Sequence, residues 1–370
     1  MLVLHTRKSM DRSNDNNFIY ALKFIACLFV ITIHAPFPGV FGDVVFALSR
    51  FAVPFFFAIS GKFLLVKRDG SYAENTKEIR KFTKNRLIKL LKVTAIVYAC
   101  YLIFSLCYFL PKGWSLGYWL HDKFNAFETR TFFMFNSGRY IYDESYVFDH
   151  LWYLFALIYV YILIIIFAPV LRKWYKWLTV LLLGLLFFGE ILQIVYPIRP
   201  FDISISTWYV LRNWLFVGMP FVLMGVIFTD SAAKRKKDLG DDKYKEKQRA
   251  LLPRNLLILL SGCALSIIEK FVFGSKEVYV GSMIMVFALL MISECGINSP
   301  GALSYLGKRA SSLIYFYHVM IISSLDILSQ NGIIPSYTMW QKPILVMVIA
   351  ILIFGVIPIL FDKVRVNEQK

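Results

Sequence analysis

The sequence predicts an all-α polytopic membrane protein with about ten transmembrane helices and both termini in the cytoplasm. Three observations lead to this prediction: 58% of the 370 residues are hydrophobic, apolar runs near helix-crossing length recur along the chain, and Lys and Arg gather in alternate loops. Soluble domains average about 45–50% apolar residues, and one helical crossing of a bilayer needs about 20 residues. The runs are continuous rather than alternating, which argues against a β-barrel.

We expect one membrane domain over residues 1–370, with a helical core over 18–362. The expected spans are 18–37, 44–66, 88–110, 149–170, 174–196, 207–228, 254–273, 278–295, 311–328 and 341–361. The basic cluster Arg172, Lys173 and Lys176 separates the fourth span from the fifth, and the eighth span is short. The first span lacks a small-residue cleavage pattern, so we expect it to be retained.

The basic residues set the expected orientation. The N-terminal segment, the even-numbered loops and the C-terminal segment carry 29 Lys and Arg, against 7 in the other loops. Because positive residues favour the cytoplasmic side, we expect the termini and the charged loop 230–253 inside, and the loop 111–148 outside. The formal charge of +17 then reflects these loops and their contact with anionic membrane lipids, and we expect no nucleic-acid partner.

The two long loops differ in composition. Loop 111–148, called the outer loop below, mixes Trp, Tyr and Phe with charged residues such as Glu128, Arg130 and Arg139. This mixture suits a surface that binds sugars, and it also suits a lid resting at the membrane interface. Loop 230–253 is expected to be a solvated or lipid-touching linker, partly helical. The five cysteines lack metal-ligand spacing, so we expect core thiols and no metal site.

The first span carries Lys23 and His34, two groups that are costly inside a membrane. Eleven residues of α-helix bring them to within about 20° of one face and separate them by about 16 Å. A cation at the cytoplasmic end and an imidazole at the outer end suit an elongated anionic ligand and proton transfer near neutral pH. The alternative is a snorkelling lysine and a histidine bonded to a backbone carbonyl.

Arg50, Arg86 and Lys89 are the other candidate site residues. Arg50 is expected near the outer start of the second span, across a hairpin from His34, where it would steady an oxyanion or act as an interfacial anchor. Arg86 and Lys89 share a helix face at the cytoplasmic start of the third span, which suits phosphate binding or ordinary positive flanking. The sequence leaves open the roles of three further ionisable groups, His318, Glu190 and Arg212.

Five segments, taken in order, resemble the membrane-bound acyltransferase family 3, also called the O-acetyltransferase family. They are Lys23 with His34, Arg50 to Gly61 (RFAVPFFFAISG), Phe82 to Lys89 (FTKNRLIK), His150 to Leu154 (HLWYL) and Leu303 to His318 (LSYLGKRASSLIYFYH). The resemblance covers about residues 18–362. It departs from the arginine that the family often has at Lys23 and Lys89, where lysine keeps the charge but loses the bidentate fork.

The resemblance implies a ten-helix enzyme that moves an acyl group, usually acetyl, from cytoplasmic acyl-CoA to a hydroxyl of an extracytoplasmic glycan. His34 would take the catalytic role, while Lys23, Arg86 and Lys89 would hold the acyl-CoA donor. Arg50 is the expected partner of the oxyanion, and the outer loop is expected to recognise the acceptor. The alternative is a transporter that exports a lipid-linked or polymeric glycan without chemistry, since the same fold is proposed for such proteins.

Overall fold

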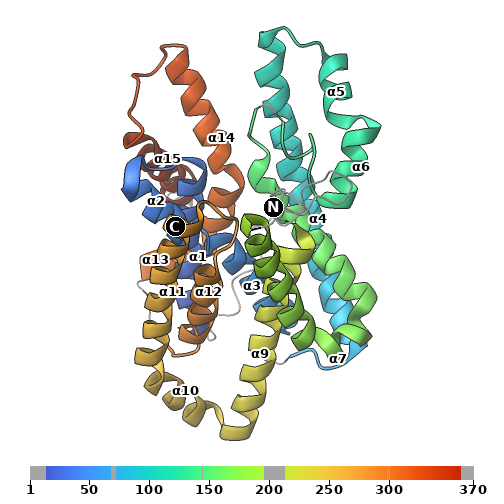
Figure 1. The fold of residues 1–370 in the computed structure, drawn as a ribbon, viewed down its shortest axis with the longest axis vertical. Coiled ribbons are helices and arrows are strands. Elements are labelled where there is room, and N and C mark those ends of the chain that lie inside the picture. The colour runs from blue at the N-terminus through green and yellow to red at the C-terminus, as the bar shows by residue number, and fades with distance from the viewer. Residues whose placement is uncertain are drawn as a thin grey trace, which may run out of the picture. The chain divides into compact units, whose positions relative to one another are not determined.

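The structure of the protein is a computed structural model, which describes residues 14–67, 72–143, 145–195, 213–297, 299 and 301–359. Over these residues the chain forms helices and no β-strand, which confirms the all-α fold class (Figure 1). The α-helices are α1 (Asn14–His34), α2 (Gly39–Ser49), α3 (Ala52–Leu64), α4 (Thr76–Phe109), α5 (Leu116–Phe124), α6 (Ala126–Phe135), α7 (Trp152–Val195), α9 (Met219–Leu239), α10 (Asp241–Ala250), α11 (Leu252–Phe273), α12 (Val280–Ile292), α13 (Gly301–Arg309), α14 (Ser311–Gln330) and α15 (Gln341–Ile351).

Within the described residues, 8 helical stretches are long and apolar enough to cross a membrane. They are Asn17–His34, Gly39–Leu64, Thr76–Lys112, Asp149–Gly189, Trp214–Leu239, Leu252–Phe273, Ser311–Gln330 and Gln341–Ile359. Helix α12 is also apolar but has only 13 residues, in agreement with the short eighth span. The polytopic membrane fold is therefore confirmed, whereas the number of ten spans and the cytoplasmic termini remain predictions.

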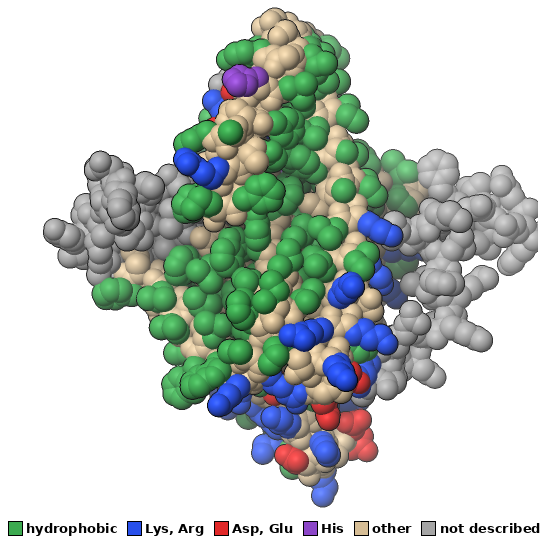
Figure 2. All heavy atoms as spheres, turned by 90° about the vertical axis from the view of Figure 1, so that its right-hand side faces the viewer, with side chains coloured by type: hydrophobic (Ala, Val, Ile, Leu, Met, Phe, Trp, Pro, Cys, Tyr) green, Lys and Arg blue, Asp and Glu red, His purple; other side chains and the backbone are tan. Residues whose placement is uncertain are grey.

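The helices that could cross a membrane expose large hydrophobic side chains on their outer surface. Large hydrophobic side chains stand exposed on several of them, among them Ile103 on α4, Val180 on α7 and Leu257 on α11. Figure 2 shows a wide area of hydrophobic side chains on the face drawn, with Lys and Arg gathered toward one end of it. An exposed apolar area of this extent is unfavourable in water, and contact with lipid removes that cost.

The contacts divide the chain into two compact units. The first unit comprises Met1–Ala52, Arg235–Gly274 and Tyr279–Lys370, and the second comprises Val53–Lys234 with Ser275–Val278. In the first unit α11 and α12 lie side by side (Figure 1). Their close approach follows from Gly262 and Gly281, since a Cβ at Gly281 would lie 2.4 Å from the Gly262 carbonyl oxygen.

The second predicted span is not one helix from residue 44. It begins at Gly39 and is broken at Arg50 and Phe51 into α2 and α3. Pro54 explains the break, because proline has no N–H to donate to the carbonyl of Arg50, four residues earlier. Arg50 therefore lies where the apolar stretch Gly39–Leu64 divides into α2 and α3, and its position near the outer side of the membrane stays a prediction.

Two further helix boundaries differ from the prediction. Helix α4 begins at Thr76 rather than residue 88, and the Asn75 side chain caps it by accepting the Glu78 N–H at 2.9 Å. Helix α7 runs without interruption through Arg172, Lys173 and Lys176, so the predicted division of 149–196 into two helices is wrong. The basic residues from Lys77 to Lys84 and those from Arg172 to Lys176 were assigned to loops, although Lys and Arg are good helix formers.

The two long loops are largely helical. The outer loop contains α5 and α6, and the charged loop 230–253 is formed mainly by the end of α9 and by α10, which confirms its partly helical character. The sixth predicted span is described from Trp214 onward, where a short π-helix leads into α9. Arg212 and the side chain of Glu190 lie outside the described residues.

Candidate active site

In the first unit, α1 lies parallel to α13 and α14, and four contacts keep the helices in register. In chain order the contacting pairs are Asn17–Ser304, Tyr20–Gly307, Cys27–Ser311 and His34–His318. The partners are 287 residues apart at Asn17–Ser304 and 284 apart at Cys27–Ser311. A nearly constant offset is what two helices running side by side in the same direction require, and the small change falls where α13 ends and α14 begins.

The lower part of this contact depends on small residues. A Cβ placed on Gly307 would lie 1.7 Å from the carbonyl oxygen of Tyr20, so the backbone of α13 touches that of α1. One turn earlier, the Ser304 hydroxyl donates a hydrogen bond to the Asn17 carbonyl at 3.0 Å. Close helix contact through small and hydroxyl residues is typical of membrane bundles. The segment LSYLGK is therefore a helix-packing motif in this chain.

The upper part of the contact brings together two histidines. The rings of His34 and His318 have centroids 5.1 Å apart, at an angle of 57°. His318 is completely buried, and its Nδ1 lies 2.8 Å from the Tyr315 carbonyl oxygen and 3.1 Å from that of Ile314. Since carbonyl oxygens only accept hydrogen bonds, Nδ1 carries the proton, and a neutral His318 has its lone pair on Nε2. The half-buried His34 thus faces a ring of fixed orientation.

Lys23 lies on the same helix as His34, as the spacing predicts. Helix α1 is uninterrupted from Asn14 to His34, which supports the separation expected from helical geometry. Lys23 is half-buried, with its Nζ 5.9 Å from the centre of the Tyr20 ring and the Cys27 thiol one turn further along. The lysine end of α1 packs on α13 and the histidine end on α14, so both candidate groups border the same helix pair.

Arg50 lies at the end of α2, with its guanidinium 4.2 Å from the centre of the Phe46 ring. The ring of the next residue, Phe51, meets the ring of Phe29 on α1 at 5.5 Å. Because Phe29 precedes His34 by five residues, this contact lies about 7–8 Å along α1 from the histidine. Arg50 is therefore placed beside α1, at the junction of α2 and α3, and its oxyanion role remains a prediction.

Arg86 and Lys89 lie in the second unit, one turn apart on α4, and both are exposed. The Arg86 Nη2 donates to the Phe63 carbonyl at 3.3 Å, at the end of α3, where helix carbonyls lack partners within the helix. A guanidinium has five N–H donors, so this bond leaves others for a phosphate. Lys23 belongs to the other unit, so a donor site that combines the three cations remains a prediction.

The remaining motifs of the second unit build its scaffold. A Cβ on Gly61 would lie 1.9 Å from the Val222 carbonyl oxygen, so the backbone of α3 lies directly against that of α9. In the segment HLWYL, the Tyr153 hydroxyl lies 3.1 Å from the Ser60 hydroxyl, and the buried His150 packs against the Tyr101 ring at 5.1 Å. These contacts join α3, α4 and α7.

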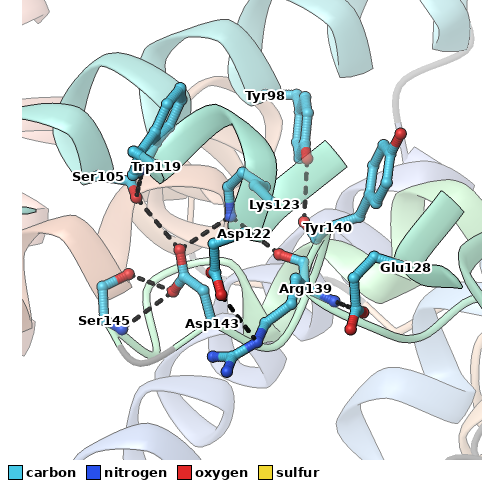
Figure 3. Close-up of polar contacts among 10 residues, drawn as sticks. All are labelled: Tyr98, Ser105, Trp119, Asp122, Lys123, Glu128, Arg139, Tyr140, Asp143 and Ser145. Carbon is cyan, nitrogen blue, oxygen red and sulfur yellow. Dashed lines mark hydrogen bonds and ion pairs between the residues drawn. The ribbon is translucent and has the colours of Figure 1, made fainter. Parts of the chain in front are cut away.

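A second buried polar cluster fastens the outer loop to α4 (Figure 3). The ion pair between Lys123 and Asp143 has an N···O distance of 2.8 Å, with side chains only 2% and 3% exposed. Asp143 also accepts the Ser105 hydroxyl at 3.1 Å, and Ser105 accepts the Trp119 indole N–H at 3.1 Å. Burial lowers the pKa of Lys123, and the adjacent Asp143 carboxylate opposes that change. Sequence reasoning missed this pair, which no periodicity reveals.

These features define a class of protein: an all-α membrane protein with an imidazole pair held between parallel apolar helices. The chain belongs to the acyltransferase-3 family, since the family described as "Acyltransferase domain" matches residues 16–362, nearly the whole chain. No curated protein and no solved structure matches it. The family match confirms the resemblance seen in the sequence, and the protein is a membrane acyltransferase.

Proposed function

We propose that this enzyme transfers an acyl group, acetyl in the usual case, from cytoplasmic acyl-CoA to a hydroxyl of an extracytoplasmic glycan in the cell envelope. The plasma membrane is the proposed location, because it separates such a donor from such an acceptor. The observation that supports this proposal most directly is the contact between His34 and His318 in a chain of the acyltransferase-3 family. Imidazole exchanges protons near neutral pH, as activation of a hydroxyl requires.

In the proposed reaction, His34 accepts the proton of the acceptor hydroxyl as the oxygen attacks the thioester carbonyl. A C–O bond forms, and Arg50 is the proposed partner of the resulting oxyanion. The C–S bond then breaks, and the CoA thiolate takes up the proton held by His34. The products are an O-acyl ester and free CoA, so no oxidant, reductant or metal ion enters the balance.

His318 is proposed to position His34 rather than to touch substrate. Its Nδ1–H is directed to the backbone of its own helix, which fixes the plane of its ring. The contact between the rings then restricts the orientations open to His34. A base that is already oriented avoids part of the entropy cost of reaching the reactive geometry.

The donor phosphates are proposed to interact with Lys23, Arg86 and Lys89, on the ground of charge. Arg86 and Lys89 are exposed and share a face of α4, where they are accessible to a soluble donor. Exposed cations bind phosphates with modest and salt-dependent strength, so we expect several contacts to act together.

The alternative from another class is a transporter that moves a glycan without chemistry. The experiment uses the purified full chain in lipid nanodiscs with acetyl-CoA and an extract of cell-envelope glycan as the acceptor, and a thiol reagent measures the CoA released. We expect catalytic release of CoA, together with acetylated surface glycans, detected by mass spectrometry, in cells that carry the protein. Absence of CoA release, with glycan export that depends on the protein, would establish the transporter instead.

A further inference from the structure

A cavity of about 700 Å³ lies in the outer loop, between α6 and residues 137–142. Its volume is within the range of about 300–1,000 Å³ typical of small-molecule sites. The lining is mostly apolar and includes the exposed Phe127 ring. The polar groups that line it are two arginines, one glutamate and three hydroxyl residues, namely Arg130, Arg139, Glu128, Thr131, Ser137 and Tyr142.

One cation of the cavity lining has no acidic partner among the described residues. Arg130 is exposed and lies over the Phe127 ring at 5.7 Å, and within the described parts of the chain no carboxylate pairs with it. Glu128 is the acidic residue of the lining, and its Oε2 already accepts the backbone N–H of Arg139 at 2.6 Å. The same oxygen would lie 2.7 Å from a Cβ on Gly138, so the turn is built closely around it. The Glu128 carboxylate is therefore held by the wall, and Arg130 is the cation of the lining that has no carboxylate beside it among the described residues.

The wall that carries Arg139 is fixed from both sides (Figure 3). Its N–H is bound by Glu128, and its carbonyl accepts a hydrogen bond from the buried Lys123 at 2.9 Å. Its guanidinium Nε lies 3.8 Å from Asp122. At the start of the turn, the Asn136 side chain donates to the Trp152 carbonyl at 2.9 Å, which ties the turn to α7. A site held in place before its ligand arrives loses less entropy on binding.

We propose that this cavity binds a sugar unit carrying a carboxylate or phosphate group, as the acceptor subsite of the acyltransferase. An aromatic face, hydroxyl groups and arginines together suit a sugar ring with an anionic substituent, because arginine binds carboxylate and phosphate through paired hydrogen bonds. The rival occupant is an anionic phospholipid headgroup, which needs the cations but not the hydroxyls or the ring. The assignment as acceptor subsite rests on the proposed function.

The test compares two single-charge variants of the full chain in detergent. Arg130→Gln removes the guanidinium that has no carboxylate partner, and Lys112→Gln removes another exposed cation of the outer loop, which lies over Tyr108 and outside the cavity lining. The probes are tetragalacturonic acid and sialyllactose, with maltotetraose as the neutral saccharide, measured by calorimetry. We expect the wild type to bind an anionic probe more tightly than maltotetraose. Arg130→Gln should weaken that binding about tenfold, or about 1.4 kcal/mol, while Lys112→Gln leaves it unchanged.

Three outcomes would overturn the inference. In the first, neither anionic probe binds to the wild type. In the second, the two variants weaken binding equally. In the third, no saccharide binds, and Arg130→Gln alone loses affinity for phosphatidylglycerol nanodiscs. Acetyl-CoA turnover by the wild-type protein is measured in parallel. Intact turnover without saccharide binding overturns this inference alone, whereas absence of turnover overturns the proposed function.

Discussion

Each of the two units contains a pair of polar side chains in contact, and the two pairs have different roles. Lys123 and Asp143 are paired with each other, and neighbouring hydroxyl and carbonyl groups complete their hydrogen bonds. His34 and His318 meet as rings, and His318 binds the backbone of its own helix. The ion pair keeps its charges and fixes a fold, whereas imidazole exchanges a proton near neutral pH. The ability of imidazole to exchange a proton near neutral pH is therefore what distinguishes the histidine pair from the structural ion pair.

The largest effect is expected from breaking the ion pair. Asp143→Ala leaves the Lys123 ammonium buried without its carboxylate, which typically costs about 3–5 kcal/mol. We expect the outer loop to become sensitive to protease and the thermal midpoint of the purified protein to fall. The double variant Lys123→Met with Asp143→Leu should recover most of the loss, because it removes both charges. If Asp143→Ala is as stable as the wild type, the ion pair does not have the structural role described for it.

The next effect concerns the helix contact that brings the histidines together. Gly307→Ala places a methyl group where the Tyr20 carbonyl lies, and overpacking of this kind costs about 1–3 kcal/mol. Gly301→Ala on the same helix is the control, because its Cβ would meet nothing within 4 Å. The thermal midpoint and the rate of CoA release should both fall in Gly307→Ala and stay unchanged in Gly301→Ala. Equal behaviour of the two variants would contradict the packing described for α1 and α13.

His318 offers a smaller effect that sharpens the comparison. His318→Asn keeps a donor for the backbone carbonyl but loses the ring that contacts His34. We expect kcat to fall by about 10- to 100-fold, as a misplaced catalytic group would cause, with the KM for acetyl-CoA unchanged. Protein abundance and thermal stability are measured in the same preparations. A variant with normal kcat, or with lowered stability that accounts for all of the loss, would reduce His318 to a structural role.

The smallest effect is expected at the exposed cations of α4. Lys89→Ala should raise the KM for acetyl-CoA a few-fold, because an exposed charge contributes about 0–1 kcal/mol. The increase should shrink at high salt, where surface charges are screened. Lys84→Ala is the matched control, since Lys84 is also exposed on α4 but turned by about 140° from Lys89. If both variants change the KM alike, the proposed donor contact at Lys89 is wrong.

The sequence predicts well whatever depends on local periodicity. Apolar runs revealed the membrane helices, and the 100° rotation per residue placed Lys23 and His34 on one face of α1. The sequence predicts poorly where the same residue type is common in two kinds of structure. Basic residues were read as loop at the start of α4 and within α7, where they continue a helix. The break between α2 and α3 at Arg50 and Phe51 was not expected, because residues 44–66 were predicted to form one span.

Contacts between distant segments could not be predicted at all from one sequence. The sequence leaves the role of His318 open, and nothing in the local sequence shows that this residue meets His34 from another helix. The same holds for Lys123 and Asp143, which come from a loop without regular pattern. The late segment Leu303 to His318 was the useful part of the resemblance. Its residues Ser304, Gly307, Ser311 and His318 contact α1.

The central claim is that His34 acts as the base of acyl transfer, and one measurement tests it most directly. CoA release and acceptor acetylation are compared, per folded protein, for His34→Ala and His34→Gln. A general base typically contributes about 10²–10⁴-fold, so both variants should lose activity on that order while their abundance and stability stay normal. Glutamine keeps a hydrogen bond but exchanges no proton near neutral pH. Near-normal turnover in His34→Gln, with reduced abundance in His34→Ala, would contradict the claim and show that the histidine is structural.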